Sequence, residues 1–183
     1  MKCQKCNKES TINFKHLGNL CDNCFINIIQ KRVKKELRNK WNFKKDQRIL
    51  IVENDTKEGK VNVYLAQLIT NKLPALIDIK NNVDLDKELD NYDIIFIPWS
   101  LDNEVEEFLS EVFKNEIFIS KYKSKVIKLL RGLSEEEIEM IAKIKNISFI
   151  EEEKSELEKF IENIEKKYPG SKFALLKSKE IID

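Results

Sequence analysis

Four cysteines near the N-terminus constrain the fold of this chain more than any other feature of its sequence. They are Cys3, Cys6, Cys21 and Cys24, which form two C-x2-C pairs separated by fourteen residues. Each pair can form a turn whose sulfurs face one point, and two such turns supply the tetrahedral set of thiolates that Zn²⁺ prefers. Because four protein ligands leave no open position for water or substrate, we predict a structural zinc site.

The four thiols have two alternatives to binding zinc. Two disulfides are disfavoured because the chain opens on charged residues rather than on an export signal. An iron–sulfur cluster also takes four thiolates and stays open as an alternative, although paired turns at this separation are more typical of zinc fingers. A segment of about 25 residues has too small a core to fold alone, so the metal should stabilise it.

Composition excludes several classes of protein. His16 is the only histidine. This rules out a Ser-His-Asp catalytic triad or a Cys-His catalytic dyad in the rest of the chain, and also a histidine-based metal hydrolase site. We interpret His16 as a loop residue rather than a fifth ligand. No apolar run reaches the roughly 18 residues that span a bilayer. We expect a soluble cytoplasmic protein, with 42% hydrophobic residues to build one sizeable core.

The net charge of +1 hides a strong asymmetry along the chain. Residues 1–48 carry 13 Lys and Arg against 4 Asp and Glu, a local charge of +9, whereas residues 49–183 carry 20 against 28, a local charge of −8. A basic module on an acidic body indicates contact with a polyanion at one end. We predict a zinc finger with a basic helix over residues 1–47 and a second domain over residues 48–183.

A basic helix is predicted directly after the second cysteine pair. Phe25, Ile29, Val33 and Leu37 recur at helical spacing, and Glu36 is the only acid within the basic run that follows. A solvated helix face would explain such a run, but the near absence of acids favours contact with a phosphate backbone. The predicted RNA-binding residues are Lys31, Arg32, Lys34, Lys35, Arg38 and Lys40. We interpret Trp41 and Phe43, which follow, as packing residues rather than as platforms for bases.

The rest of the chain alternates between apolar runs and amphipathic segments, which predicts a three-layer α/β domain with a parallel sheet. The expected strands are 48–52, 75–79, 94–98, 116–120, 125–130 and 147–150. The expected helices are 61–71, 101–114, 134–145 and 154–168. Ser134 and Glu137 have the spacing of a capping box, a pair that closes a helix N-terminus.

Ligands of parallel sheets bind beyond the carboxyl ends of the strands, so the loop after the first strand is the place to look for chemistry. A phosphate cradle needs glycines there, so that backbone N–H groups can surround the oxygens. The loop has one glycine, Gly59, and three acids, Glu53, Asp55 and Glu58, that would repel a triphosphate. We therefore predict no nucleotide-binding residues.

Several segments resemble the TtuA-type tRNA thiolation family, whose eukaryotic relatives form the cytoplasmic wobble-uridine 2-thiolation complex. They are CQKC, LCDNCF, KRVKKELR and RILIV near the N-terminus, followed by WSLDNEVEEFL, KVIKLLRGLSEEEIEMIAKIKNI and KKYPGSKFALLKS. The last of these is similar to the family's HPGTKFxLLRS ending. The resemblance implies a zinc finger and basic helix ahead of a PP-loop ATP pyrophosphatase domain, which is adenine nucleotide alpha hydrolase-like.

Departures from the family pattern change what the resemblance implies. The family's SGGKDS loop falls at residues 54–59, where only Lys57 matches, and no cysteine follows Cys24 to match those of catalytic members. Asp102 and Glu104 match the LDDE positions of the family, but we interpret Asp102, without the loop that it serves, as a helix cap rather than a catalyst. The expected fold is thus a shortened PP-loop domain with a degenerate active site.

The resemblance therefore implies a non-catalytic second subunit of a tRNA wobble-uridine 2-thiolation complex, with no catalytic residues. Its expected partners are tRNA and a catalytic PP-loop thiolase, in a heterodimer or a larger complex, and no membrane. Two alternatives stay open: a divergent nucleotide-binding or sulfur-transfer enzyme that uses Lys57 and Asp102, and a stand-alone zinc-containing RNA-binding adaptor. The second of these alternatives includes a zinc-stabilised homodimer with no thiolase partner.

Overall fold

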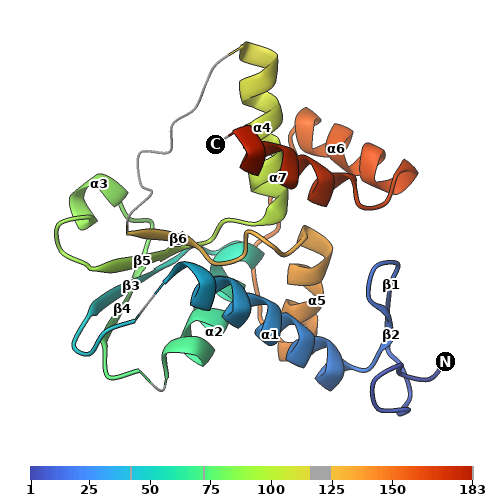
Figure 1. Cartoon of the computed structure of the whole chain (residues 1–183), viewed down its shortest axis with the longest axis horizontal. Helices are drawn as coiled ribbons and strands as arrows, with labels where there is room; N and C mark the ends of the chain where they lie inside the picture. The colour runs from blue at the N-terminus through green and yellow to red at the C-terminus, as the bar shows by residue number, and fades with distance from the viewer. Residues whose placement is uncertain (42, 72, 116–124, 183) are drawn as a thin grey trace. The chain divides into compact units, whose positions relative to one another are not determined.

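The computed structural model describes residues 1–41, 43–71, 73–115 and 125–182, and it divides into two compact units (Figure 1). We call Met1–Trp41 the finger unit and Asn42–Asp183 the body unit. Among the described residues, no helix combines the length and the apolar character needed to cross a membrane.

The finger unit is a small antiparallel hairpin followed by one long helix. Strands β1 (Ile12–Phe14) and β2 (Gly18–Leu20) pair with Ile12 opposite Leu20. The hairpin favours glycine at position 18, because its φ of +71° lies in the left-handed region. Helix α1 (Asp22–Lys40) then begins directly after Cys21 and is followed by its C-cap residue, Trp41.

The body unit is built on a four-stranded parallel sheet in the order β4-β3-β5-β6 (Figure 1). The two central strands are continuous apolar runs, as expected for strands covered on both faces. The strands are β3 (Arg48–Glu53), β4 (Leu76–Asn81), β5 (Ile94–Ile97) and β6 (Val126–Lys128). The predicted α/β class with a parallel sheet is confirmed.

Alternation along β3 and β5 sends side chains to both faces of the sheet. Leu50 and Ile95 lie opposite each other and join a buried cluster with residues of α3 (Leu85–Glu88). Helix α2 (Lys57–Thr70) packs against the same two strands, and the buried Asn62 amide donates to the carbonyls of Val52 and Phe96. This amide connects α2 to the carboxyl ends of both central strands.

The Phe43 ring packs on the sheet face opposite Leu50. It contacts Phe96 with ring centroids 6.5 Å apart, which agrees with a packing role for Phe43.

A second apolar core joins three helices of the body unit. Leu101, Val105 and Ile161 form its buried centre. The contributing helices are α4 (Leu101–Lys114), α6 (Glu156–Lys167) and α7 (Ser171–Ile182), whereas α5 (Glu135–Lys145) packs against α2. Three helices begin with capping boxes, Ser100 with Asn103, Ser134 with Glu137, and Ser155 with Glu158; only the second was predicted.

The strand predicted at residues 147–150 is wrong. This segment has no ladder partner among the described residues. Ile150 is 64% exposed, and its N–H donates to the Asp55 carbonyl. The segment 125–130 does contain a strand, β6, but it is only three residues long. The predicted strand at 116–120 lies outside the described residues. Helix α7 (Ser171–Ile182) was not predicted from the sequence.

Candidate functional site

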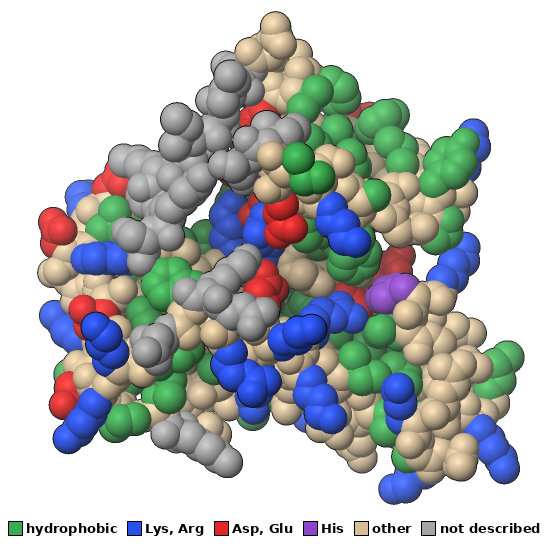
Figure 2. Space-filling view, viewed as in Figure 1, with side chains coloured by type: hydrophobic (Ala, Val, Ile, Leu, Met, Phe, Trp, Pro, Cys, Tyr) green, Lys and Arg blue, Asp and Glu red, His purple; other side chains and the backbone are tan. Residues whose placement is uncertain are grey.

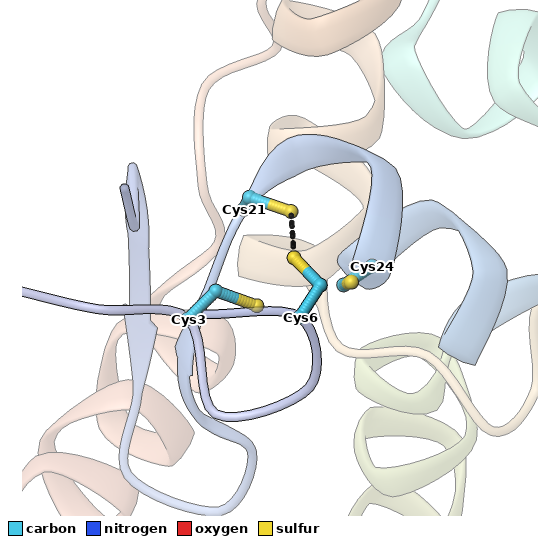
Figure 3. Close-up of side chains that lie close together, drawn as sticks. All are labelled: Cys3, Cys6, Cys21 and Cys24. Carbon is cyan, nitrogen blue, oxygen red and sulfur yellow. Dashed lines mark hydrogen bonds between the residues drawn. The ribbon is translucent and has the colours of Figure 1, made fainter. Parts of the chain in front are cut away.

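The structure brings the four cysteines together at one point (Figure 3). Cys3 and Cys6 lie on a tight turn in which the Asn7 N–H donates to the Cys3 carbonyl. Cys21 is the residue before α1 and Cys24 lies in its first turn. The Cys6 and Cys21 sulfurs are 3.6 Å apart, and all four sulfurs lie within 4.8 Å of one another.

The surroundings shift the pKa values of the Cys3 and Cys24 thiols in opposite directions. Hydrogen bonds to the sulfurs of Cys6 and Cys21 raise the pKa of the Cys24 thiol to about 12, because they stabilise its protonated form. At Cys3 desolvation opposes the charge, but backbone N–H groups of Lys5, Cys21 and Cys6 outweigh it and lower the pKa to about 6. A bound cation would stabilise the thiolate form of Cys24 against these hydrogen bonds.

The spacing of the sulfurs fits a single tetrahedral ion. With Zn–S bonds of about 2.3 Å, the sulfurs of a tetrahedral site lie about 3.8 Å apart, close to the spacing in this group. All four protein ligands would be thiolates, and His16 is not part of the group. Instead, the His16 ring packs against the Phe14 ring with centroids 5.7 Å apart. The assignment of the four cysteines as metal ligands stays a prediction.

Helix α1 presents four of its six predicted RNA-binding residues on one face. Lys31, Lys34, Lys35 and Arg38 follow an i, i+3, i+4, i+7 pattern and are exposed, whereas the buried apolar side chains lie on the opposite face. Lys and Arg side chains follow this helix in the space-filling view (Figure 2). Arg32 is half-buried beside the stripe, and the side chain of Lys40 lies outside the described part of the chain.

The loop after β3 is closed by packing and by ion pairs. Gly59 lies in the first turn of α2, where a Cβ would be 1.9 Å from the Asn54 side-chain oxygen, so this glycine serves close packing within the loop. Lys60 pairs with Glu53 at 2.7 Å and with Asp55 at 3.1 Å. Lys57, the residue that matched the family motif, pairs with Glu135 of α5.

A cavity of about 570 Å³ lies beside this loop, where ligands of parallel sheets usually bind. Its described lining is strongly acidic, with Lys57 and Lys154 as the cations. Burial raises the pKa of Glu58, whereas burial at Glu135 is outweighed by Lys57 and Lys154, which lower the pKa of that carboxyl. The lining carboxyl groups are Glu58, Asp102, Glu106, Glu135, Glu151, Glu152, Glu153 and Glu158.

Asp102 is a cap, but not of the helix that contains it. Ser100 caps α4, while the Asp102 carboxylate accepts a hydrogen bond of 2.7 Å from the Glu135 N–H, the first amide of α5. The other Asp102 oxygen accepts from the buried Lys172 of α7. Asp102 therefore connects three helices at the rim of the cavity. The interpretation of Asp102 as a structural residue agrees with these contacts.

Two residues that shape this cavity were missed from the sequence. Glu135 holds Lys57, and Lys154 pairs with Glu135 at 2.9 Å and with Glu162. Burial alone would lower the pKa of Lys154, but the two carboxylates outweigh burial and raise that pKa. This lysine therefore stays charged. Neither residue carries a local motif: Glu135 lies in a run of three acids and Lys154 follows another.

Comparisons with known proteins give a fold but no family from sequence. No protein-family model matches the chain, and no curated protein matches it in sequence. Among solved structures, the U34-tRNA thiolase NcsA from Methanococcus maripaludis, with its [4Fe-4S] cluster, is similar with a TM-score of 0.81. The match covers 100% of this chain and 87% of that chain at 18% identity. This likeness supports the predicted fold class.

Proposed function

We propose that this chain is the non-catalytic subunit of a tRNA wobble-uridine 2-thiolation complex, and that it binds tRNA and a catalytic PP-loop thiolase. The structural likeness to a U34-tRNA thiolase supports a role in tRNA thiolation. Each unit binds a different partner: the basic face of α1 contacts the RNA backbone, and the acidic body unit contacts the thiolase.

The acid-lined cavity is the observation that carries the non-catalytic assignment. A triphosphate entering it would meet eight carboxyl side chains, and the two lysines of the described lining already pair with acids. The glycine of the loop packs against Asn54 rather than leaving space for phosphate oxygens. All cysteines of the sequence lie in the finger unit, so the body unit has no thiol for sulfur transfer.

Calorimetry with ATP and Mg²⁺ tests the non-catalytic assignment directly. We expect no heat of binding to the metal-loaded protein. A second titration with the Glu135→Gln variant controls for a site that is only masked by the Lys57–Glu135 ion pair. Saturable binding by the wild-type protein would contradict the proposal and favour the divergent nucleotide-binding enzyme.

We assign the ion at the four cysteines as structural Zn²⁺, held by Cys3, Cys6, Cys21 and Cys24. The similar thiolase carries a [4Fe-4S] cluster, which makes a cluster the competing assignment. Sulfurs within 4.8 Å of one another favour one ion, because in a cluster four irons and their sulfides separate the thiolates. Zn²⁺ would supply folding free energy and no reaction step.

Elemental analysis of protein purified without added zinc tests this assignment. We expect one zinc per chain, and loss of that zinc in a Cys6→Ser/Cys21→Ser variant. Iron together with acid-labile sulfide, in protein purified without oxygen, would overturn the assignment in favour of a cluster.

The exposed stripe on α1 supports contact with the RNA backbone. Its four cations span about 10 Å along the helix, so they can meet successive phosphates of one strand. Each phosphate that a protein neutralises steepens the fall of log K with log salt by about 0.9 for B-form duplexes and about 0.7 for single strands. Reversing Lys34, Lys35 and Arg38 should therefore weaken tRNA binding for every tRNA and reduce that slope by roughly 2 to 3.

A matched variant separates a local contact from a general effect of charge. Lys166, Lys167 and Lys177 are exposed lysines of the body unit, and their reversal changes the net charge by the same amount. Filter binding over a salt series should show near wild-type slope for this control. If the α1 variant and the control behave alike, α1 is not the RNA-binding surface. If neither changes the affinity, the RNA role is contradicted.

Partner binding is tested by mild-salt affinity purification from the native host. Co-elution of a protein with an intact SGGKDS loop, together with tRNA, is the expected result. RNA without that protein would instead favour the stand-alone adaptor.

A further inference from the structure

Strand β4 forms an open edge of the sheet in the described part of the chain (Figure 1). In that part of the chain only β3 pairs with β4, and most side chains of β4 are exposed. Leu76 is 65% exposed, and Ile77 and Ile79 are 37% and 41% exposed. An exposed edge with β-branched residues is a template for pairing with another strand.

The backbone of β4 shows which residues offer hydrogen bonds to such a strand. The Leu76 N–H donates to Gln47 and the Asn82 N–H donates to Glu53, so even-numbered residues face β3. Because successive residues alternate, the N–H and C=O groups of Ile77, Ile79 and Asn81 point away from the sheet.

We propose that this edge pairs with the same edge of a second copy of the chain, antiparallel, about a twofold axis through Ile79. A twofold axis makes the interface self-complementary, and the two four-stranded sheets would join into one. Ile79 would face Ile79 of the second copy, and Ile77 would face Asn81, so that all outward-pointing groups are paired. The inference does not rest on the proposed role in tRNA thiolation.

Charge selects this register over its neighbours. With the axis at Ile79, Asp78 faces Lys80 of the second copy, and the twofold axis makes this ion pair occur twice. Moving the axis to Asp78 would oppose two carboxylates, and moving it to Lys80 would oppose two ammonium groups. In the chosen register like charges meet only at diagonal positions, about 7 to 8 Å apart, where their repulsion is weaker.

Contacts within the chain hold both charged residues on one face of β4. The Tyr92 hydroxyl donates to Asp78 at 2.8 Å, and Lys80 pairs with Glu88 at 2.8 Å. A carboxylate accepts several hydrogen bonds and an ammonium group donates three, so each retains capacity for a partner across the edge. The Lys80 side chain is 42% exposed.

The opposite face of the edge is apolar. Ile77 and Ile79 pair with Ile49 and Ile51 of β3 and therefore lie on the same face as those buried residues. In the dimer each Ile79 would cover its counterpart and the Ile77 diagonal to it, which removes from water the apolar surface that the single chain leaves exposed. A second copy thus matches this edge in hydrogen bonding, charge and apolar contact at once.

Sedimentation of the full-length, metal-loaded protein over about 10 μM to 1 mM tests the proposal. At physiological salt the mass should rise with concentration from 21.6 kDa to about twice that value. Ile79→Lys would place two ammonium groups at the axis and should raise the dissociation constant at least about tenfold. Ile181→Lys, at an apolar α7 residue that is 86% exposed, should leave association unchanged.

A charge swap tests the register and does not depend on a single variant. Asp78→Lys and Lys80→Asp each oppose like charges and should weaken the dimer at least about tenfold, whereas the double variant restores opposite charges and should recover most of the affinity. Circular dichroism confirms that each variant is folded. A wild-type protein that stays monomeric throughout, an Ile79→Lys variant that dimerises normally, or a double variant as weak as the single ones would each overturn the proposal.

Discussion

Glu104 is a buried acid of α4 that pairs with cations outside this helix, and its removal tests how much these ion pairs stabilise the body unit. It is 2% exposed and lies among three cations: Lys128 at 2.6 Å, Lys179 at 3.1 Å and Arg131 at 3.5 Å. Burial alone would raise the pKa of Glu104, but the three cations outweigh it and hold the pKa below its ordinary value. Glu104 therefore stays ionised in the folded protein.

Glu104→Gln keeps the shape of the side chain and removes its charge. Breaking a buried ion pair by removing one partner costs about 3 to 5 kcal/mol. Lys128 and Lys179 keep Glu107 as a partner, which favours the lower end, about 3 kcal/mol. That is a large part of the roughly 5–15 kcal/mol by which a domain is stable.

Urea unfolding followed by Trp99 fluorescence measures this loss. Trp99 lies against the core cluster of the body unit, and a Trp41→Phe background removes the signal of the finger unit. With a slope of about 2 kcal/mol per molar, the midpoint should fall by about 1.5 M. The control is Glu139→Gln, whose exposed pair with Lys143 contributes less than about 0.5 kcal/mol.

The pH dependence of the same experiment tests whether the ionised form of Glu104 is the one that stabilises the fold. A carboxyl whose pKa is lowered by folding contributes stability above its unfolded pKa, about 4.3 for Glu, and loses it as the pH falls through the folded value. The difference between wild type and Glu104→Gln should therefore be constant from about pH 7 to 5 and shrink below about pH 4. A midpoint shift no larger than that of Glu139→Gln would refute the reasoning.

Three further perturbations have defined outcomes. Chelation of the metal should unfold the finger unit and leave the body unit folded, so that only the amide resonances of the finger unit collapse in NMR spectra; loss of both units together would contradict this. Asp102→Asn weakens the cap of α5 and the ion pair with Lys172. Thermal unfolding should show that the free energy of unfolding falls by about 1 to 3 kcal/mol. An unchanged free energy of unfolding would show that these contacts do not stabilise the fold. Gly59→Ala forces a Cβ against Asn54 and should destabilise the body unit by about 1 to 3 kcal/mol in urea, whereas a stable variant would show that the loop can relax.

The sequence predicted those parts of the fold that depend on local patterns. Continuous apolar runs identified β3 and β5, because a strand buried on both faces needs no polar alternation. The amphipathic helix α4 was predicted with its observed bounds, Leu101–Lys114. The cysteine spacing predicted that four sulfurs would meet, which they do.

The parts that were missed depend on partners distant in the sequence. The run ending at Ile150 has the composition of a strand, but a strand also needs a neighbour to pair with, and none lies beside it in the described part of the sheet. In the same way Lys57 and Glu135 are 78 residues apart and Asp102 and Lys172 are 70 apart. Charge counts show that such residues exist but not which ones meet.

The ion pairs beside the cavity form a chain of alternating charge, from Lys57 through Glu135 and Lys154 to Glu162. This chain makes the site difficult to re-engineer for nucleotides. Replacing Glu135 to free Lys57 would also remove a partner of Lys154, which connects the segment before α6 to the rest of the body unit. A designer would have to supply a new attachment for that segment before clearing the cavity of its acids.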